Sequence, residues 1–340
     1  MKVPFIAFGL AVFTLSSSAA INEPVAFSHN DWELACDNTR TCRAAGYQSE
    51  SGTSAPVSML ITRDAGPATA IDVKVQIGDE DEVKGLVRLR VGKVMVSGLG
   101  SDAILDAGQI RAVMPALLSA DEAVLTGKGK HWTLSLAGLN AVLLKMDEAQ
   151  GRIGTPGALV RRGNKPESSV LAPVPPPVFV ATKLPKVRVG DDALASRIFS
   201  SLDLHDVNEQ CNNGAGLQPD SFKVYRLSGK KVLLSFACSM GAYNSSSLLW
   251  IANDKPPYAP VSIEANGDFD EKDASVTSSI KGRGVGDCWS SETWHFNGKV
   301  FVRTAAQGDG MCRGFAGGAW GLPRYVSRLV PTPAVTPSFP

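Results

Sequence analysis

A segment rich in proline interrupts the chain near its middle. Residues 165 to 186 read KPESSVLAPVPPPVFVATKLPK and contain six prolines. Proline fixes one backbone dihedral and lacks an N–H, so this run favours the extended polyproline II conformation of a semi-rigid spacer. Recognition of the run by a partner is the alternative. We predict a linker over residues 161–186, between a domain over 21–160 and a domain over 187–330. Residues 331–340, again rich in proline, are expected to form a loose tail.

The first twenty residues, MKVPFIAFGLAVFTLSSSAA, have one lysine, an apolar run and small residues at the end. This pattern is typical of a cleaved signal peptide, and the apolar run is too short to span a bilayer. An uncleaved amphipathic anchor is the alternative. We therefore expect an exported, periplasmic protein, and no later segment is long and apolar enough to cross a membrane.

Charge gives little guidance toward a partner. Without Lys2 the mature chain carries 33 basic and 33 acidic residues, since the 34 basic residues lose one and the 33 acidic residues lose none. A net charge of zero gives no electrostatic reason to expect nucleic acid or an anionic membrane. Hydrophobic residues at 44% and charged residues at 20% are typical of a folded, soluble protein.

An even number of cysteines in an exported chain indicates disulfides. No CxxC pair occurs, so the pattern supports neither a thioredoxin-type redox site nor a zinc knuckle. Six cysteines allow fifteen connectivities, and position along the chain favours one of them. The favoured pairs each flank a turn or hairpin: Cys36 with Cys42, Cys211 with Cys238, and Cys288 with Cys312.

Hydrophobic periodicity predicts an α+β fold for the first domain, rich in strands and with two helices. Strand-like alternation begins at DWELAC and recurs up to HWTLSL. Residues 105–120 carry Ile110 and Val113 at helical spacing, and Pro115 marks either a middle turn or a second helix start. Residues 137–154 form the second helical pattern.

The second domain is predicted to be mainly β. Its one convincing helix covers residues 191–202, with Asp191 or Asp192 as N-cap. Two later segments match each other: VYRLSGKKVLLSFAC and TWHFNGKVFVRTAA both place an aromatic residue four positions before a glycine that a lysine follows. Each reads as a hairpin that cysteines flank, and Asn297-Gly298 is a strong turn signal. We therefore predict a domain of disulfide-linked hairpins.

The sequence indicates no metal, cofactor or hydrolase motif. No G-x-S-x-G elbow is present, and His131 and His295 each lie in a strand pattern beside a tryptophan. The acidic residues of 266–273 lack the EF-hand spacing, so a solvated turn is the expectation there. The glycines of 281–289 lack the lysine-serine pair of a P-loop and fit a turn.

A pair of carboxylates is the weak catalytic candidate. Asp287 precedes Cys288, and Asp309 lies three residues before Cys312, so a bridge would carry both acids to one end of the domain. Carboxylates about 5 to 9 Å apart suit glycoside hydrolysis, and nearby tryptophans can stack a sugar. Aspartate in a GDG sequence is also a standard turn former.

The densest unusual stretch is GDGMCRGFAGGAWGLPRY, residues 308–325, with six glycines, two arginines and a tryptophan. Tryptophan and arginine are favoured anchors of binding surfaces. We therefore expect an edge that contacts a partner, formed by Trp289, Asp309, Arg313, Phe315, Trp320 and Arg324.

Four motifs resemble a secreted Gram-negative family known as domain of unknown function 1176: NDWELACDNTRTCRAAGY, DEAQGRIGTPGALVRRG, GRGVGDCW and GDGMCRGFAGGAWGLPRYVS. The likeness covers nearly the whole mature chain. The first domain is also similar to the invasion-associated locus B family, through a tryptophan, a nearby cysteine pair and the SLAGLNAVL step. That family has a further cysteine pair at its helix region, which this chain lacks, so its role in host-cell invasion is not carried over. Neither resemblance implies a catalytic residue.

These observations lead to three hypotheses of function. The first is a non-catalytic periplasmic protein that binds a protein or envelope partner through the second domain, for example a cell-wall hydrolase or a toxin. The second is a carbohydrate-active hydrolase that uses Asp287 and Asp309. The third is a structural envelope protein whose two domains bridge components across the linker.

Overall fold

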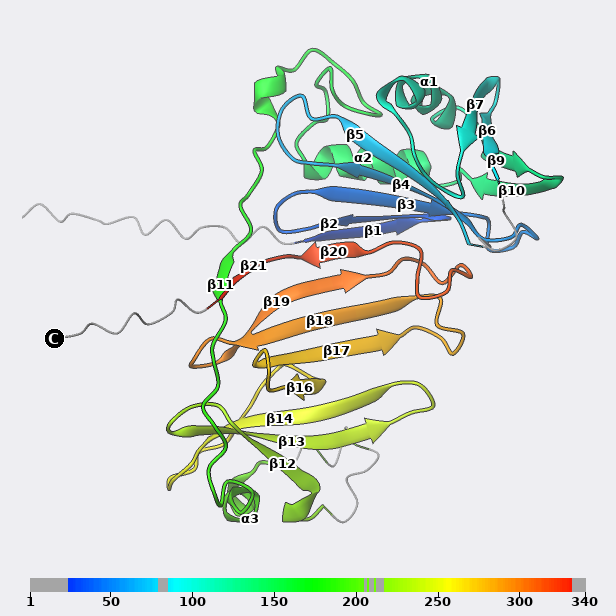
Figure 1. The fold of residues 1–340 in the computed structure, drawn as a ribbon. Coiled ribbons are helices and arrows are strands. Elements are labelled where there is room, and N and C mark those ends of the chain that lie inside the picture. The colour runs from blue at the N-terminus through cyan, green and yellow to red at the C-terminus, as the bar shows by residue number, and fades with distance from the viewer. Residues whose placement is uncertain (1–23, 79–84, 205–206, 208–210, 212–216, 332–340) are drawn as a thin grey trace, which may run out of the picture.

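The structure of the chain is a computed structural model (Figure 1). Strands dominate its described part, which holds three α-helices. This β-rich character confirms the coarse expectation from the sequence. The expected signal peptide, residues 1–20, lies outside the described residues, as does the expected tail beyond residue 331. The structure describes residues 24–78, 85–204, 207, 211 and 217–331.

Two antiparallel sheets form the N-terminal half, by which we mean the described residues up to 160. Six strands lie in the order β1-β2-β3-β4-β5-β8, and four lie in the order β10-β9-β6-β7. The first sheet contains β1 (Val25–His29), β2 (Trp32–Cys36), β3 (Cys42–Tyr47), β4 (Val57–Arg63), β5 (Ile71–Ile77) and β8 (Asp102–Ile104). The second contains β6 (Val87–Val91), β7 (Val94–Leu99), β9 (Glu122–Gly127) and β10 (Lys130–Ser135).

Helix α1 (Ala107–Leu117) begins with a reciprocal cap. The Asp106 side chain accepts a hydrogen bond from the Gln109 backbone, and the Gln109 side chain accepts one from the Asp106 backbone. These two bonds satisfy donors that every helix start leaves free. Pro115 lies inside the helix and does not begin a second one.

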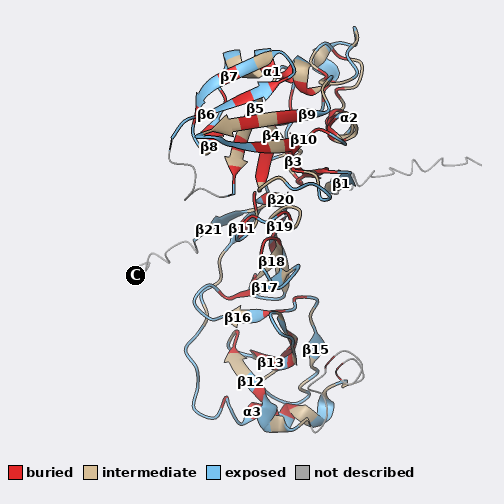
Figure 2. Cartoon of the chain, turned by 90° about the vertical axis from the view of Figure 1, so that its right-hand side faces the viewer, coloured by how far each residue is buried: buried red, intermediate tan, exposed pale blue. Residues whose placement is uncertain are grey.

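Helix α2 (Leu139–Ala149) packs on the first sheet through the stripe that its sequence predicts. Val142, Leu143 and Met146 are fully buried in one core that also contains Trp32. These positions recur at the spacing of one helix face, which is why the pattern could be read without the structure. Figure 2 shows buried residues concentrated within the sheets of this half.

Strands β2 to β4 are buried on both of their faces. Side chains alternate between the two sides of a strand. Leu34 therefore points into the core under α2, while its neighbour Ala35 points to the opposite side. Ala45 and Leu60 share that second side and are buried as well. An antiparallel sheet usually leaves one face to water, so another part of the chain must cover this outer face.

The C-terminal half, residues 187–331 as described, is mainly β as expected. Four strands lie in the order β12-β13-β14-β15, and five in the order β16-β17-β18-β19-β20. The first sheet contains β12 (Phe222–Arg226), β13 (Lys231–Met240), β14 (Ser245–Asn253) and β15 (Val261–Ser262). The second contains β16 (Asp268–Asp270), β17 (Ser275–Lys281), β18 (Trp289–Phe296), β19 (Phe301–Gly308) and β20 (Leu322–Tyr325). Short 3-10 turns of this half lie at Phe199–Ser201 and Pro219–Ser221, and another lies at Glu167–Ser169 in the proline-rich segment.

The predicted helix of this half is shorter than expected. Helix α3 spans Leu194–Ile198 and continues as a 3-10 turn. Its N-cap is Ala193 and makes no side-chain cap, so the expectation of an aspartate cap is wrong. Asp191 forms an ion pair with the buried Arg226 instead and accepts a 2.8 Å hydrogen bond from the Arg188 backbone. A buried guanidinium needs a carboxylate more than a short helix needs a cap.

All six cysteines are paired, and the pairs are those favoured from the sequence. Bridges join Cys36 to Cys42, Cys211 to Cys238 and Cys288 to Cys312. The first closes the β2–β3 hairpin, where the two residues lie opposite each other. The two matched segments form the hairpins β12–β13 and β18–β19 as predicted.

The proline-rich segment is extended and makes backbone hydrogen bonds to both halves. Val174 donates to Thr39 of the N-terminal half. Strand β11 (Val178–Val180) then pairs in parallel with β21 (Arg328–Val330) of the C-terminal half. Figure 1 shows the segment running past β21 to α3 at the far end of the molecule. The domain boundaries at residues 161 and 186 remain predictions.

Candidate functional site

The glycine-rich loop of residues 308–325 covers the outer face of β2 to β4. Phe315 and Leu322 are each 2% exposed and pack against Ala35, Ala45 and Leu60. This cluster joins the two halves of the chain through apolar contact. Phe315, which we expected to contact an external partner, contacts the N-terminal half instead.

Arg313 holds the loop to the same half through polar contacts. Its guanidinium lies 3.1 Å from an Asp31 carboxylate oxygen and donates a 3.3 Å hydrogen bond to the Gln48 carbonyl. The Gln48 side chain donates in return to the Arg313 carbonyl at 2.7 Å. Arg313 is only 8% exposed. It is therefore a contact inside the molecule, and this surface is not open to an external partner.

A half-buried acid, Glu33, lies at the centre of the junction. The Glu33 carboxylate accepts hydrogen bonds from the Tyr47 hydroxyl at 2.8 Å and from the Met311 backbone at 2.7 Å. Burial raises the pKa of Glu33 above its usual value of 4.5. Burial and the neighbouring Glu33 carboxyl raise the pKa of Tyr47 well above its usual value. Two strands of one half and one loop of the other thus meet at a single carboxylate.

Trp320 also uses its polar atom within the chain. Its indole N–H donates to the Ser58 hydroxyl at 2.6 Å, and that hydroxyl donates to the Gly46 carbonyl at 2.7 Å. Ser58 is fully buried on β4. Because a buried hydroxyl needs partners, Trp320 provides a donor to one buried oxygen of the N-terminal half.

What remains open at the junction is a pocket of about 440 Å³. Both halves line it. Trp289 is half-buried there, with one ring face 4.8 Å from the Lys281 ammonium, and Arg324 is exposed. We call this cavity the junction pocket and define it by six of its lining residues: Phe27, Glu33, Leu34, Trp289, Leu322 and Arg324. Of the expected contact residues, Trp289 and Arg324 therefore share one cavity.

The two candidate catalytic acids have different surroundings. Asp287 is 2% exposed, forms an ion pair with Arg283, and accepts a 2.7 Å hydrogen bond from the Gly314 backbone. The hydrogen bond from Arg283 lowers the pKa of Asp287, whereas burial raises that of Asp309. Asp287 is thus enclosed and fully bonded, and it fixes the loop rather than facing a substrate.

Asp287 also lies near two sulfur atoms. Its carboxylate and the Cys288 and Cys312 sulfurs lie within 4.8 Å of one another. Both sulfurs belong to one disulfide, so neither is the thiolate that a metal would require. This cluster does not fit a metal ion.

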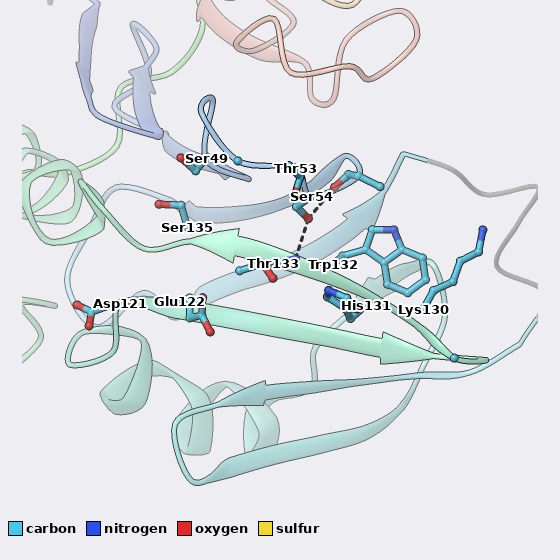
Figure 3. Close-up of a pocket in the computed structure, with 13 residues that line it drawn as sticks. Ser49, Thr53, Ser54, Asp121, Glu122, Lys130, His131, Trp132, Thr133 and Ser135 are labelled. Carbon is cyan, nitrogen blue, oxygen red and sulfur yellow. Dashed lines mark hydrogen bonds between the residues drawn. The ribbon is translucent and has the colours of Figure 1, made fainter.

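A second cavity, of about 670 Å³, lies in the N-terminal half and is lined by hydroxyl groups (Figure 3). His131 and Glu122 both face it, from β10 and β9. His131 lies opposite Thr126, four residues along β9 from Glu122, which separates the two by about 13 Å. The Ser54 hydroxyl accepts from the Thr133 backbone and donates to the Ala55 carbonyl. These residues do not form a nucleophile with its base.

The residues of the N-terminal half that meet the loop were not predicted from the sequence. Asp31, Glu33, Tyr47 and Gln48 all lie at or beside the predicted β2–β3 hairpin. One signal was available: Glu33 alternates with Leu34 and shares its strand face with Ala35. A charged residue on a face with small apolar neighbours indicates a covered surface.

No helix in the described ranges is both long and apolar enough to cross a membrane. The family described as "Protein of unknown function (DUF1176)" matches residues 26–327. A curated relative, "Uncharacterized protein YpfG" of Escherichia coli (strain K12), is 27% identical over 339 residues, which is 89% of this chain and 93% of the relative. Among solved structures, invasion associated protein B from Bartonella henselae is similar at 16% identity, with a TM-score of 0.28 over 37% of this chain and 99% of that one. The chain belongs to the DUF1176 family of proteins of unknown function.

Proposed function

We propose that this chain is an exported, non-catalytic binding protein that contacts a protein partner through the junction pocket. The observation that supports this proposal is the set of residues that line the pocket. The pocket brings a half-buried tryptophan and an exposed arginine beside a half-buried glutamate, at the meeting of two halves. Binding sites form preferentially at such meetings, and tryptophan and arginine are the residue types that most often anchor partners.

The location outside the cytoplasm is part of the same proposal. Three disulfides with no free cysteine fit an oxidising compartment. The first twenty residues have the charge and hydropathy pattern of a signal peptide. A periplasmic partner, such as an envelope hydrolase or a toxin, would meet the pocket there.

Photo-crosslinking in living cells tests the contact. We expect a variant with p-benzoylphenylalanine in place of Arg324 to form one discrete crosslinked adduct. Osmotic shock should release this adduct from the cells, and the crosslinked chain should begin after residue 20. Arg328→p-benzoylphenylalanine is the matched control, because Arg328 is also exposed but lies on β21 outside the pocket. Adding Trp289→Ala should reduce the Arg324 adduct about tenfold, the size of one lost anchor. No adduct, or the same adduct at both positions, would contradict the proposal.

A further inference from the structure

A groove of about 920 Å³ lies along α1 in the N-terminal half, apart from the junction pocket. One wall is the helix, and the other is formed by the start of β5 and by residues 157–162. Its volume lies within the range of ligand sites, roughly 300 to 1,000 Å³. Neither the family match nor the proposed function assigns anything to it.

The walls of the groove are apolar. Ile110, Met114 and Leu118 follow one another at intervals of four residues, so they form one stripe along α1. Leu159 and Val160 line the other wall. Ile110, Leu118, Leu159 and Val160 pack against the core but stay partly exposed to the groove. A hydrocarbon chain laid along the stripe would remove this surface from water, which is favourable.

The floor of the groove holds a buried cation. Arg63 is 5% exposed, and it donates to the Gly157 carbonyl at 2.8 Å and to the Thr69 carbonyl through two nitrogens. A guanidinium has five N–H donors, so two of them remain beyond these three bonds. The nearest acid is Asp147, whose Oδ1 atom lies 3.7 Å away and accepts no hydrogen bond.

The charge of Arg63 is poorly balanced in this setting. Burial, together with repulsion from Arg152, lowers the pKa of Arg63 from 12.5 to about 10. Arg111 and Arg162 are exposed and also line the groove, and none of the described residues that line it is acidic. Of the three cations around this apolar channel, only Arg63 has a carboxylate within 4.0 Å among the described residues, and that carboxylate, Asp147, lies 3.7 Å away.

We propose that this groove binds a free long-chain carboxylate, with the arginines holding its head group and the α1 stripe holding its chain. An arginine donates two parallel hydrogen bonds to a carboxylate, which gives orientation as well as affinity. The apolar stripe selects the chain. Charge complementarity distinguishes this ligand from a neutral alcohol or a cationic amphiphile.

Titration calorimetry of the full mature chain with dodecanoate, below its micellar concentration, tests this site. Dodecanol, dodecyltrimethylammonium and acetate each remove one feature of the ligand. We expect dodecanoate to bind at least about tenfold more tightly than any of the three, the effect of one charge-assisted bond. Equal binding of dodecanol, or no binding of dodecanoate, would overturn the proposal.

Substitutions that line the groove test whether dodecanoate binds there. Arg111→Gln and Arg162→Gln change exposed residues, so they leave folding intact, and each should weaken dodecanoate binding about tenfold. Leu118→Glu should abolish it by placing a carboxylate on the stripe. Arg90→Gln is the control, because Arg90 is exposed on β6 and does not line the groove. The proposed site would be rejected if Arg90→Gln weakened dodecanoate binding as much as the groove variants do. It would also be rejected if the protein bound only phosphatidylglycerol vesicles and that binding depended on the arginines.

Discussion

Glu33 forms hydrogen bonds with both halves of the chain. Its carboxylate accepts one bond from each half, from Tyr47 and from the Met311 backbone. Because burial raises its pKa above 4.5, the folded chain holds the Glu33 proton more tightly than the unfolded chain does. This contribution to stability is fully present below pH 4.5 and is lost as the pH rises through the folded pKa.

Glu33→Gln should therefore flatten the pH dependence of stability. The amide oxygen of glutamine can still accept both hydrogen bonds, and the side chain has no proton to lose. We expect the melting temperature of the variant to fall less between pH 4.5 and pH 7 than that of the parent, measured by calorimetry. Glu122→Gln, at an exposed position of β9, should keep the parent profile. If the melting temperature of Glu33→Gln fell with pH as steeply as that of the parent, Glu33 would not be the cause of the pH dependence.

The loop between β19 and β20 has no regular structure of its own, and its shape is fixed from outside. One end is held by the Cys288–Cys312 bridge, and Asp287 accepts a bond from the Gly314 backbone. Gly310 and Gly318 have φ values of +96°, a region that favours glycine. The glycines of this loop thus allow the backbone to lie close to the N-terminal sheet.

Removing this bridge should release the loop. A bridge that spans 24 residues stabilises by about 3 kcal/mol, so Cys288→Ser with Cys312→Ser should lower the free energy of unfolding by about that amount. Hydrogen exchange should show lost protection at the Met311 and Gly314 amides. Cys211→Ser with Cys238→Ser removes a bridge of similar span elsewhere and should leave those two amides protected. Equal loss of protection in both variants would reject a local role.

At the scale of the whole molecule, a substitution at Phe315 tests whether the two halves unfold in one transition. Phe315→Ala removes a buried aromatic side chain from the apolar cluster at the junction, and such a change in a core costs about 3 to 5 kcal/mol. We expect calorimetry to resolve two transitions in the variant and one in the parent. Val300→Ala, at an exposed position beside the β18–β19 turn, should change stability by no more than about 0.5 kcal/mol. A single unshifted transition for Phe315→Ala would mean that the halves are not coupled through this cluster.

The features predicted correctly are local in sequence. Helix α2 shows its buried stripe within eleven residues, and Cys36 lies six residues from Cys42. The junction could not be predicted in this way, because Trp320 and Ser58 are 262 residues apart. Tryptophan and arginine form the same kinds of contact with another molecule as with another part of the same chain. The sequence therefore indicated which residues make contacts, but not what they contact.

The covering of the β2–β4 face by residues 309–322 also sets an order of events during biosynthesis. A ribosome makes the N-terminal half first, with Ala35, Ala45 and Leu60 already in place. Their cover is made some 250 residues later, since Phe315 follows Leu60 by 255 positions (315 − 60). Until then the nascent sheet presents an apolar face that is prone to aggregation. We therefore expect that a chaperone, or export of the chain before it folds, protects this face until residues 309–322 can cover it.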